Sequence, residues 1–375
     1  MSTNEKSSKA SLPAQIRLGF FIALPLLVII NTAVWIHYVS NVESQRRQWL
    51  SQADLAMDSA LISIERWRND LSGDLRLLSN SPNLKSTLDE PSENHLLALA
   101  AEWERFMVTK RWFDQIRWLD ASGMERLRVN LTPNGATRAS YSALQDKSQR
   151  YYFQEAMTLQ SGQLYVSPID LNVESGEIER PHKPMLRLAV PISDTHGEKR
   201  GLLMANVLAN FILDELGRDV RLSANRMLLL DQRGYYVHGF KADQAWGFMS
   251  DTATDPAHRF DKAYPKVWQR IARKQSGRFE SDQGLFVYRT TRYGSDGFGQ
   301  YYILLGALLP EDMAALTAEQ RMWCLSISAL SSLLLIFSAL LTAHYRTLVF
   351  AAENPEESAT RPHPPVDHNG DSAGS

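Results

Sequence analysis

The sequence has almost no cysteine, because Cys324 is the single one among 375 residues. One cysteine excludes an intramolecular disulfide, so an exported domain must be stabilised by its own hydrophobic core. The net charge of −2 gives no basic excess, and we expect no nucleic-acid partner. The P-loop, HExxH, GxSxG and paired CxxC motifs are also missing. We therefore expect no catalytic residues, no metal site and no cofactor, and a chain that is not an enzyme.

Two long stretches, residues 18–42 and 322–345, lack Asp, Glu, Lys and Arg altogether. About 20 apolar residues cross a bilayer as a helix, so the pattern predicts transmembrane helices at 18–40 and 322–345. A cleaved signal peptide is the alternative for the first stretch, but its apolar part is long for one.

Lys6, Lys9 and Arg17 precede the first apolar stretch, where only Glu5 opposes them. Because short cytoplasmic segments carry an excess of positive charge, residues 1–17 are expected in the cytoplasm. This orientation predicts a multi-pass protein of a bacterial inner membrane, with residues 41–318 in the periplasm. Residues 346–375 are polar and rich in Pro, Ser and acidic residues, which is typical of a disordered cytoplasmic tail. No kinase or cyclase segment follows, so we expect either that the effector is a separate protein or that the chain is a sensor that has lost its output domain.

Residues 43–78 lack proline and predict a long helix. Leu50 begins an apolar repeat of seven residues, and alanine or tryptophan falls three residues after each of its first three members. This stripe fits packing onto the protein's own domain or against the same helix in a homodimer, and both remain open. Its members are Leu50, Met57, Ile64, Leu71 and Leu78, with Ala53, Ala60 and Trp67.

The pattern then changes from helical to extended, and it passes twice through a similar order of elements. Each pass contains a strand, a D-x-x-G turn at 120–123 or 231–234, and a second strand. This weak repeat predicts an α+β fold with two tandem antiparallel-sheet modules at about 93–222 and 223–312. The expected strands are 113–119, 124–130, 163–171, 185–192 and 201–208, then 227–230, 235–238, 277–280, 286–293 and 301–309; the expected shorter helices are 93–110, 146–159, 211–217 and 263–274.

The most distinctive stretch is residues 141–210. It contains DKSQRYYF at 146–153, LYVSPIDLN at 164–172, IERPHKPMLR at 178–187, AVPI at 189–192 and GLLMAN at 201–206. This run resembles the double Cache family of extracytoplasmic sensor domains, in the branch found ahead of bacterial diguanylate cyclases and hybrid histidine kinases. The resemblance covers about residues 43–316. It implies a long first helix, a membrane-distal PAS-like module with a pocket, and a membrane-proximal module.

Eight residues in this stretch are candidates for ligand contact. A guanidinium beside aromatic rings suits a carboxylate or another small anion, through paired hydrogen bonds and an apolar wall. An alternative is that Asp170, Arg180 and Arg187 form ion pairs that hold the loop at 173–184. The candidates are Arg150, Tyr152 and Phe153 at a loop-to-helix junction, Tyr165, Asp170 and Asn172 on the next strand, and Arg187 and Asn206 on later strands.

Amino-acid-binding members of the resembled family carry a fuller motif, in which a Tyr precedes the Arg, a Trp follows it and a late strand supplies an Asp. Here those places hold Ser148, Tyr152 and Asn206. The missing carboxylate removes the usual partner of a ligand ammonium group, and a dicarboxylate, another small anion or an uncharged metabolite remains open. We expect a membrane sensor that signals to an effector such as a kinase or diguanylate cyclase. The alternative is a ligand-free envelope interaction or assembly protein on the same scaffold.

Overall fold

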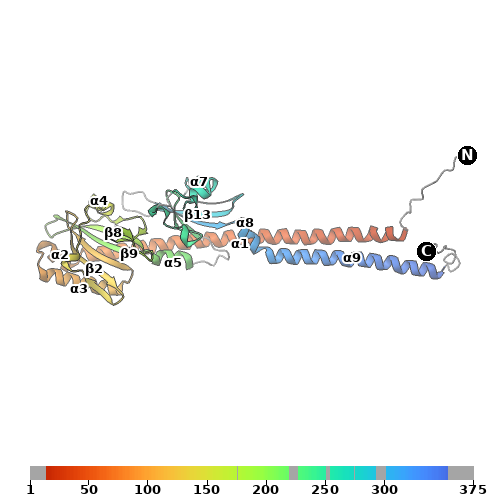
Figure 1. Cartoon of the computed structure of the whole chain (residues 1–375), viewed down its shortest axis with the longest axis horizontal. Helices are drawn as coiled ribbons and strands as arrows, with labels where there is room; N and C mark the ends of the chain where they lie inside the picture. Colours follow the sequence, from red (N-terminus) through yellow and green to blue (C-terminus); the bar gives the residue numbers. More distant parts are fainter. Residues whose placement is uncertain are drawn as a thin grey trace, which may run out of the picture. The chain divides into compact units, whose positions relative to one another are not determined.

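A computed structural model describes residues 14–174, 176–218, 227–250, 254–273, 275–292 and 301–353. The chain divides into two compact units (Figure 1). The sheet unit is Arg47–Met313, and the helical unit combines Met1–Arg46 with Ala314–Ser375. The sheet unit contains two antiparallel sheets beside a long helix, which confirms the α+β class expected from the sequence.

The helical unit contains the first part of α1 (Ala14–Ser79) and α9 (Ala318–Glu353). Both helices are long and apolar enough to cross a membrane, as the uncharged stretches predicted. Inside this unit the Ser328 hydroxyl donates to the side-chain oxygen of Asn31. Large apolar side chains such as Trp35 and Leu334 are exposed, as expected for helices surrounded by lipid.

Two sequence expectations about these helices need correction or completion. Helix α9 continues past Tyr345 to Glu353, so the expectation of disorder from residue 346 is wrong for 346–353. Residues 1–13 and 354–375, which carry the predictions of a cytoplasmic N-terminus and a disordered tail, lie outside the described residues. The predicted membrane helix and the predicted long helix form one continuous helix, because no residue between 26 and 78 is a proline.

The apolar stripe of α1 faces the sheet unit. Six of its eight members are almost fully buried, whereas Leu50 and Trp67 are half-buried. The stripe is therefore used in packing onto the chain's own domain, and packing against a second copy stays a prediction. The buried members are Ala53, Met57, Ala60, Ile64, Leu71 and Leu78.

Helix α1 ends before Pro82, as expected. The Ser81 hydroxyl then accepts a hydrogen bond of 3.1 Å from the backbone N–H of Leu84 and caps α2 (Pro82–Asp89). Sequence analysis missed this helix because it is only about two turns long. Helix α3 (Glu93–Thr109) follows and matches the expected 93–110.

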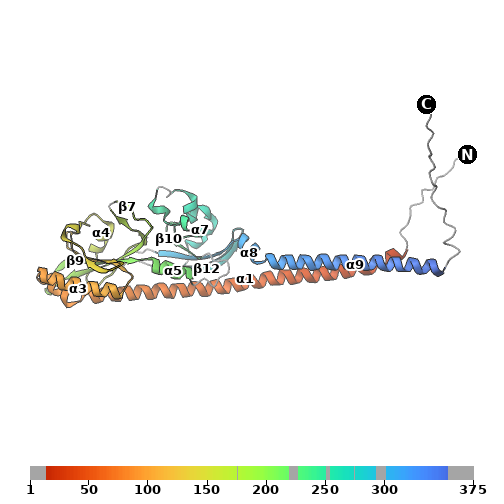
Figure 2. The same ribbon diagram turned by 60° about the horizontal axis from the view of Figure 1, so that its bottom comes forward.

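The first sheet has the strand order β3-β2-β1-β9-β8-β4, and β5 also pairs with β8. All of its pairs are antiparallel. Helix α3 packs against β1, β2 and β3, whereas α4 (Tyr151–Met157) packs against β8 and β9 (Figure 2). The strands are β1 (Phe113–Leu119), β2 (Glu125–Thr132), β3 (Gly135–Arg138), β4 (Tyr165–Val166), β5 (Asp170–Leu171), β8 (Pro184–Ser193) and β9 (Lys199–Leu208).

Two expected elements of the first sheet are shorter than predicted. The strand at 163–171 is divided into β4 and β5, because Pro168 lacks the N–H that a continuous ladder needs. The helix at 146–159 begins only at Tyr151, since the Asp146 carboxylate accepts the N–H of Ser148 and holds a turn there. A small ribbon of β6 (Val173–Glu174) and β7 (Glu177–Ile178) and the short helix η1 (Tyr141–Ala143) complete this module.

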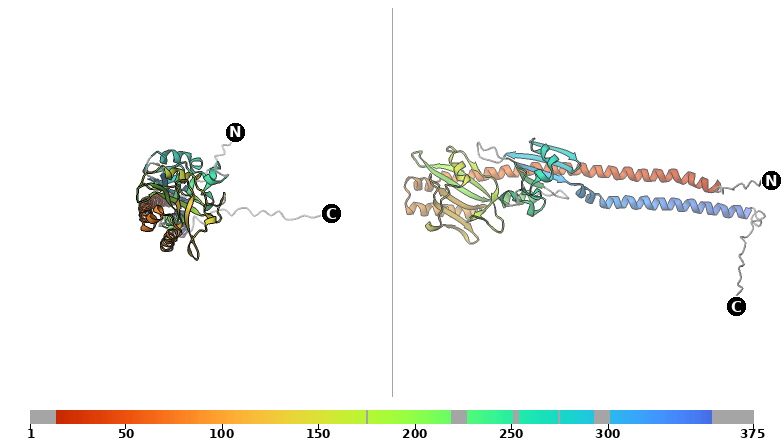
Figure 3. Two further views of the ribbon diagram at one scale, coloured as in Figure 1. Left: turned by 90° about the vertical axis from the view of Figure 1, so that its left-hand side faces the viewer. Right: turned by 45° about the horizontal axis from the view of Figure 1, so that its top comes forward.

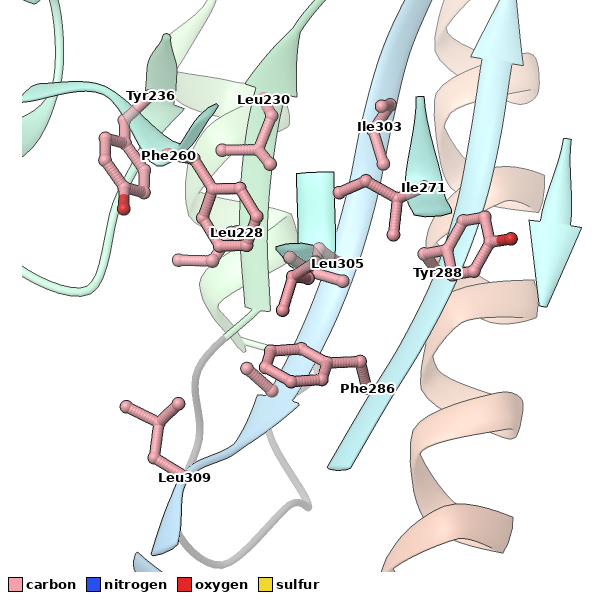
Figure 4. Close-up of a cluster of buried hydrophobic side chains, with 12 residues drawn as sticks. Leu228, Leu230, Tyr236, Phe260, Ile271, Phe286, Tyr288, Ile303, Leu305 and Leu309 are labelled. Atoms are coloured by element: carbon pink, nitrogen blue, oxygen red, sulfur yellow. The ribbon is translucent and has the colours of Figure 1, made fainter. Parts of the chain in front are cut away.

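The second sheet has the order β11-β10-β14-β13-β12 and packs one face against α6 (Phe260–Ala263) and α7 (Pro265–Ile271). Phe260, Phe286, Ile303 and Leu305 are fully buried in this core (Figure 4). The strands are β10 (Met227–Asp231), β11 (Tyr236–His238), β12 (Ser276–Ser281), β13 (Gly284–Arg292) and β14 (Tyr301–Leu308); the remaining helices are α5 (Asn210–Arg218), η2 (Ala242–Gln244), η3 (Gly247–Met249), η4 (Pro256–His258) and α8 (Pro310–Leu316).

The other face of the second sheet lies against α1 (Figure 3). A side chain at Gly306 of β14 would approach the Met57 methyl group to 3.1 Å and Ala53 to 3.9 Å, so strand and helix are in close contact. Arg289 of β13 adds ion pairs of 2.9 Å to Asp54 and to Asp58. Glycine at position 306 therefore brings β14 directly onto the long helix.

Candidate functional site

A polar cavity of about 180 Å³ lies on the face of the first sheet that also carries α4. Its walls come from β1, β2, β5, β8 and β9, the loop before α4 and the second sheet module. The lining residues are Gln115, Arg117, Arg128, Gln145, Lys147, Arg150, Tyr151, Tyr152, Asp170, Asn172, Val173, Arg187, Asn206 and Met249.

The floor of this cavity follows from strand register. Gln115 of β1 is paired with Asn206 of β9, and Asn206 is paired with Arg187 of β8. Arg117 stands two residues beyond Gln115 and is paired with Arg128 of β2. Because side chains two residues apart share a face, these polar groups project from one side of the sheet. Alternation along neighbouring strands thus builds a polar floor.

A buried ion-pair network fixes part of that floor. The Glu125 carboxylate lies 3.4 Å from Arg117 and 2.9 Å from Arg128, and its side chain is completely buried. Arg117 also donates to the side-chain oxygen of Asn206, whose amide nitrogen donates to Gln115 at 3.2 Å. The Nε–H of Arg117 is buried and makes no hydrogen bond within the described part of the chain. Glu125 therefore orients two guanidinium groups beside the cavity.

A second pair lies opposite. A guanidinium nitrogen of Arg187 is 2.5 Å from Asp170, and the Arg187 guanidinium lies 5.1 Å from the centre of the Tyr152 ring. Burial opposes the charged form of Arg187, but Asp170 and Tyr151 favour it, and its pKa is raised above the ordinary value. Burial, and then the charge of Asp170, raise the pKa of Tyr151. Its hydroxyl therefore stays protonated and donates to Asp170 at 2.9 Å.

The remaining cations lie at the loop before α4. Arg150 occupies the N-cap position of α4, and its side chain makes no ion pair with the described residues. Lys147 donates a hydrogen bond of 2.5 Å to Gln145. Among the described residues that line the cavity, five are cationic and Asp170 alone is acidic. This excess of positive charge suits an anion, which planar guanidinium groups bind through paired hydrogen bonds.

The structure brings together six of the eight residues singled out from the sequence, namely Arg150, Tyr152, Asp170, Asn172, Arg187 and Asn206. Phe153 and Tyr165 do not line the cavity. Both belong to the apolar cluster between α4 and the sheet, and the Tyr165 hydroxyl donates to Glu155 at 2.7 Å. The alternative of a loop-holding set of ion pairs is present in part. Asp170 and Arg187 form an ion pair, but Arg180 makes no ion pair with any described residue.

Sequence analysis missed several cavity residues, including Gln115, Arg117, Arg128, Tyr151 and Met249. A signal was present for the strand residues, because polar side chains alternate with apolar ones at 115 and 117 and again at 128 and 130. Met249 had no comparable signal, since it reaches the cavity from the second sheet module through a tertiary contact.

The fold and sequence have known relatives. The family model of the bacterial histidine kinase sensor domain matches residues 63–304. A domain of a sensory box/GGDEF family protein from Vibrio parahaemolyticus is similar with a TM-score of 0.60 and 24% identity, covering 73% of this chain and 99% of that one. The extracellular domain of a protein described as a histidine kinase is also similar, with a TM-score of 0.60, 24% identity and coverage of 74% and 95%.

No curated protein matches the chain. The family match and the structural similarities agree with the double Cache resemblance carried by residues 141–210, and that resemblance is confirmed. The family match covers more than half of the sequence. This chain belongs to the family of bacterial histidine kinase sensor domains.

Proposed function

We propose that this chain is a membrane-anchored receptor that binds a small anionic metabolite in the polar cavity. The observation that carries the proposal is the set of five cationic side chains around a cavity of about 180 Å³. Two of them are held in place by Glu125, and one by Asp170. Glu125 thus preorganises Arg117 and Arg128 to meet a carboxylate, whereas Arg187 exchanges Asp170 for the ligand.

The charges of the cavity favour a dicarboxylate or similar anion over an α-amino acid. An ammonium group needs an acceptor, but Asp170 already binds Arg187 and Tyr151, and Glu125 lies between Arg117 and Arg128. The Asn206 side chain is an amide with both ends engaged. A ligand-free scaffold would be favoured by a cavity filled with apolar side chains, whereas the described lining residues are mostly polar.

Two candidate membrane helices and the positive charge of residues 1–17 support an inner-membrane location for the receptor. In this arrangement residues 41–318 are periplasmic and residues 346–375 are cytoplasmic. Binding favours one of two arrangements of the sheet unit, and the membrane helices carry this bias to a kinase or diguanylate cyclase effector. The bias is no larger than the difference in ligand affinity between the two arrangements.

The test is thermal unfolding of the full chain in lipid nanodiscs with acetate, succinate, L-glutamate, sulfate and phosphate. An anion at one hundred times its Kd stabilises a folded protein by about 2.7 kcal/mol. For a domain of this size, that corresponds to a rise in Tm of about 5–10 °C. We expect succinate to give a larger rise than L-glutamate.

Arg150→Ala should weaken binding of the active anion at least about tenfold, because an Arg–carboxylate pair contributes more than about 1.4 kcal/mol. The Tm without ligand should not change, since the described structure gives Arg150 no ion-pair partner to lose. Arg126→Ala is the matched control, because Arg126 is an exposed arginine of β2 outside the cavity. If none of the five anions stabilises the chain, or if both variants bind equally well, the anion-receptor function is wrong.

A further inference from the structure

Three consecutive residues, Ile169, Asp170 and Leu171, connect the polar cavity with the second sheet module. The backbone N–H of Ile169 donates to the Tyr302 hydroxyl at 2.8 Å, and this contact is buried. The backbone N–H of Leu171 donates to the sulfur of Met249 at 3.0 Å. Between them, the side chain of Asp170 binds Arg187 in the cavity. The segment thus has its backbone tied to one module and its charged side chain in the other.

The two contacted residues of the second sheet module, Tyr302 and Met249, are both fixed by backbone hydrogen bonding. Tyr302 is almost fully buried on β14, where it pairs with Asp231 of β10 and Thr291 of β13. Met249 stands three residues after Trp246, whose φ of 69° is left-handed and unfavourable for a bulky side chain. The N–H of Met249 donates to the Trp246 carbonyl at 2.9 Å, which fixes the turn that presents the sulfur.

We propose that the segment 169–171 couples occupancy of the cavity to strand β14, with Tyr302 and Met249 as its two points of attachment. This inference rests on the proposed function of the cavity as an anion site. An anion bound to Arg187 places a like charge beside Asp170 and competes for the same guanidinium. Asp170 then releases Arg187, and the backbone on either side of it moves with respect to Tyr302 and Met249.

Strand β14 can respond to a movement of segment 169–171 because of its neighbours in the sheet and in the chain. It lies between β10 and β13, and at Gly306 it packs directly on Met57 of α1. It is also the last strand before α8 and α9 in the chain. A change in the local stability of β14 therefore affects the last strand of the sheet unit, which precedes the candidate membrane helix α9 in the chain.

The coupling is tested by hydrogen–deuterium exchange of the full chain in lipid nanodiscs, without any ligand. Asp170→Asn removes the charge that binds Arg187 and imitates its release by an anion. We expect exchange in the peptide covering 301–308 to rise about tenfold, equivalent to about 1.4 kcal/mol of easier local opening. The double variant with Tyr302→Phe should show no further rise in this peptide over Tyr302→Phe alone, because the connection is already broken.

Tyr301→Phe is the matched control, since its hydroxyl makes no hydrogen bond with the described residues and stands on the same strand. In that background the effect of Asp170→Asn on 301–308 should persist. Met249→Leu removes the other attachment without a loss of volume, and it serves as the test if Tyr302→Phe does not fold. In that background the response should fall by at least about half.

The coupling is overturned if Asp170→Asn changes exchange at 165–172 and leaves 301–308 unchanged, or if the response at 301–308 is the same in the Tyr301→Phe and Tyr302→Phe backgrounds. These outcomes are separate from the anion screen. Binding of succinate together with an unchanged β14 would reject the coupling alone. A response that depends on Tyr302, without binding of any anion in the screen, would reject the proposed function alone.

Discussion

At the scale of single residues, Glu125 is the side chain on which the cavity floor depends most. It is completely buried, pairs with Arg117 and Arg128, and also accepts the N–H of Gln145 at 3.1 Å. Buried ion pairs do not necessarily add stability compared with apolar residues, but removal of one partner leaves the others charged and unpaired. Loss of the Glu125 carboxylate should therefore destabilise the fold by more than the hydrogen bonds it makes would contribute.

Glu125→Gln should lower the free energy of unfolding by about 3–5 kcal/mol, because the buried Arg117 and the partly buried Arg128 lose their counter-charge. Urea denaturation of the full chain in detergent, followed by tryptophan fluorescence, measures this change. The control is Glu198→Gln, which removes an exposed partner 3.4 Å from Arg200 and should change stability by about 0–1 kcal/mol. Equal effects of the two substitutions would show that the floor network is not preorganised.

Asp114 should make stability depend on pH. Burial raises the pKa of this carboxyl, although Lys183 at 2.6 Å acts in the opposite direction. Between its unfolded pKa of about 3.9 and its higher folded pKa, the native state binds more protons, so Asp114 lowers stability as the pH rises through this window. Asp114→Asn should therefore gain stability relative to the wild type from about pH 4 upward.

Urea denaturation at several pH values from about 3.5 to 7 measures the effect of Asp114. Lys183→Gln should move the window to higher pH, because it removes the cation that favours the ionised carboxyl. Parallel stability curves for wild type and Asp114→Asn would contradict a raised pKa.

Sequence analysis identified some cavity residues and missed others for physical reasons. Arg150 and Tyr152 were found because they lie two positions apart in the chain, and a local motif is visible without a structure. Phe153 and Tyr165, which the sequence grouped with them, lie in the apolar cluster instead, since aromatic residues near a motif serve the core as readily as a site. Arg117 was missed because its partner Arg128 becomes its neighbour only through antiparallel pairing.

At the scale of elements, the hairpin of β8 and β9 illustrates how closely strands approach the neighbouring turn. Gly201 has a φ of 119°, and a side chain there would lie 2.0 Å from the carbonyl oxygen of Leu119. Gly197, in the turn of the same hairpin, has a φ of 84° but nothing within 4 Å. Both positions favour glycine because their φ angles are positive, but only at Gly201 would a side chain also clash with a neighbouring backbone.

Gly201→Ala should therefore cost about 4 kcal/mol or more of unfolding free energy, because the strand must move away from a neighbouring backbone. Gly197→Ala should cost only about 1–2 kcal/mol, which is the price of a left-handed alanine. Thermal unfolding of the two variants in parallel measures the difference. Similar Tm values would mean that β9 does not approach β1 as closely as described.

Elements were predicted best where the apolar pattern is long and regular. The strand at 113–119 coincides with β1, and the helix at 93–110 differs from α3 by one residue. The strand at 163–171 was wrong as one element because its pattern continues through Pro168, whereas backbone pairing does not. Helix α2 is stabilised by a serine cap and by packing. The helix is too short for a hydrophobic period to be recognised in its sequence.

At the scale of the whole molecule, the uncharged stretches and the positive residues before them make a testable topology. In a Cys324→Ser background, Ser142→Cys places a thiol on an exposed residue of the sheet unit, and Ser7→Cys places one near the N-terminus. A membrane-impermeant maleimide should label position 142 in spheroplasts, but position 7 only after lysis, because the proposed topology puts the two on opposite sides of the membrane. Labelling of both positions in intact spheroplasts would contradict two membrane crossings in this orientation.

The cavity floor has an evolutionary consequence. Gln115 and Arg117 stand on alternate positions of β1, and β2, β8 and β9 add Arg128, Arg187 and Asn206. Neighbouring positions such as Ile116, Leu186 and Ala205 are buried on the other face. Compensated changes, such as replacement of Glu125 together with Arg117 and Arg128, can therefore alter the charge of the floor while the apolar packing behind it stays the same. With the cavity as the proposed binding site, proteins that share this backbone can diverge toward chemically different ligands, and nearly identical sheets need not respond to the same compound.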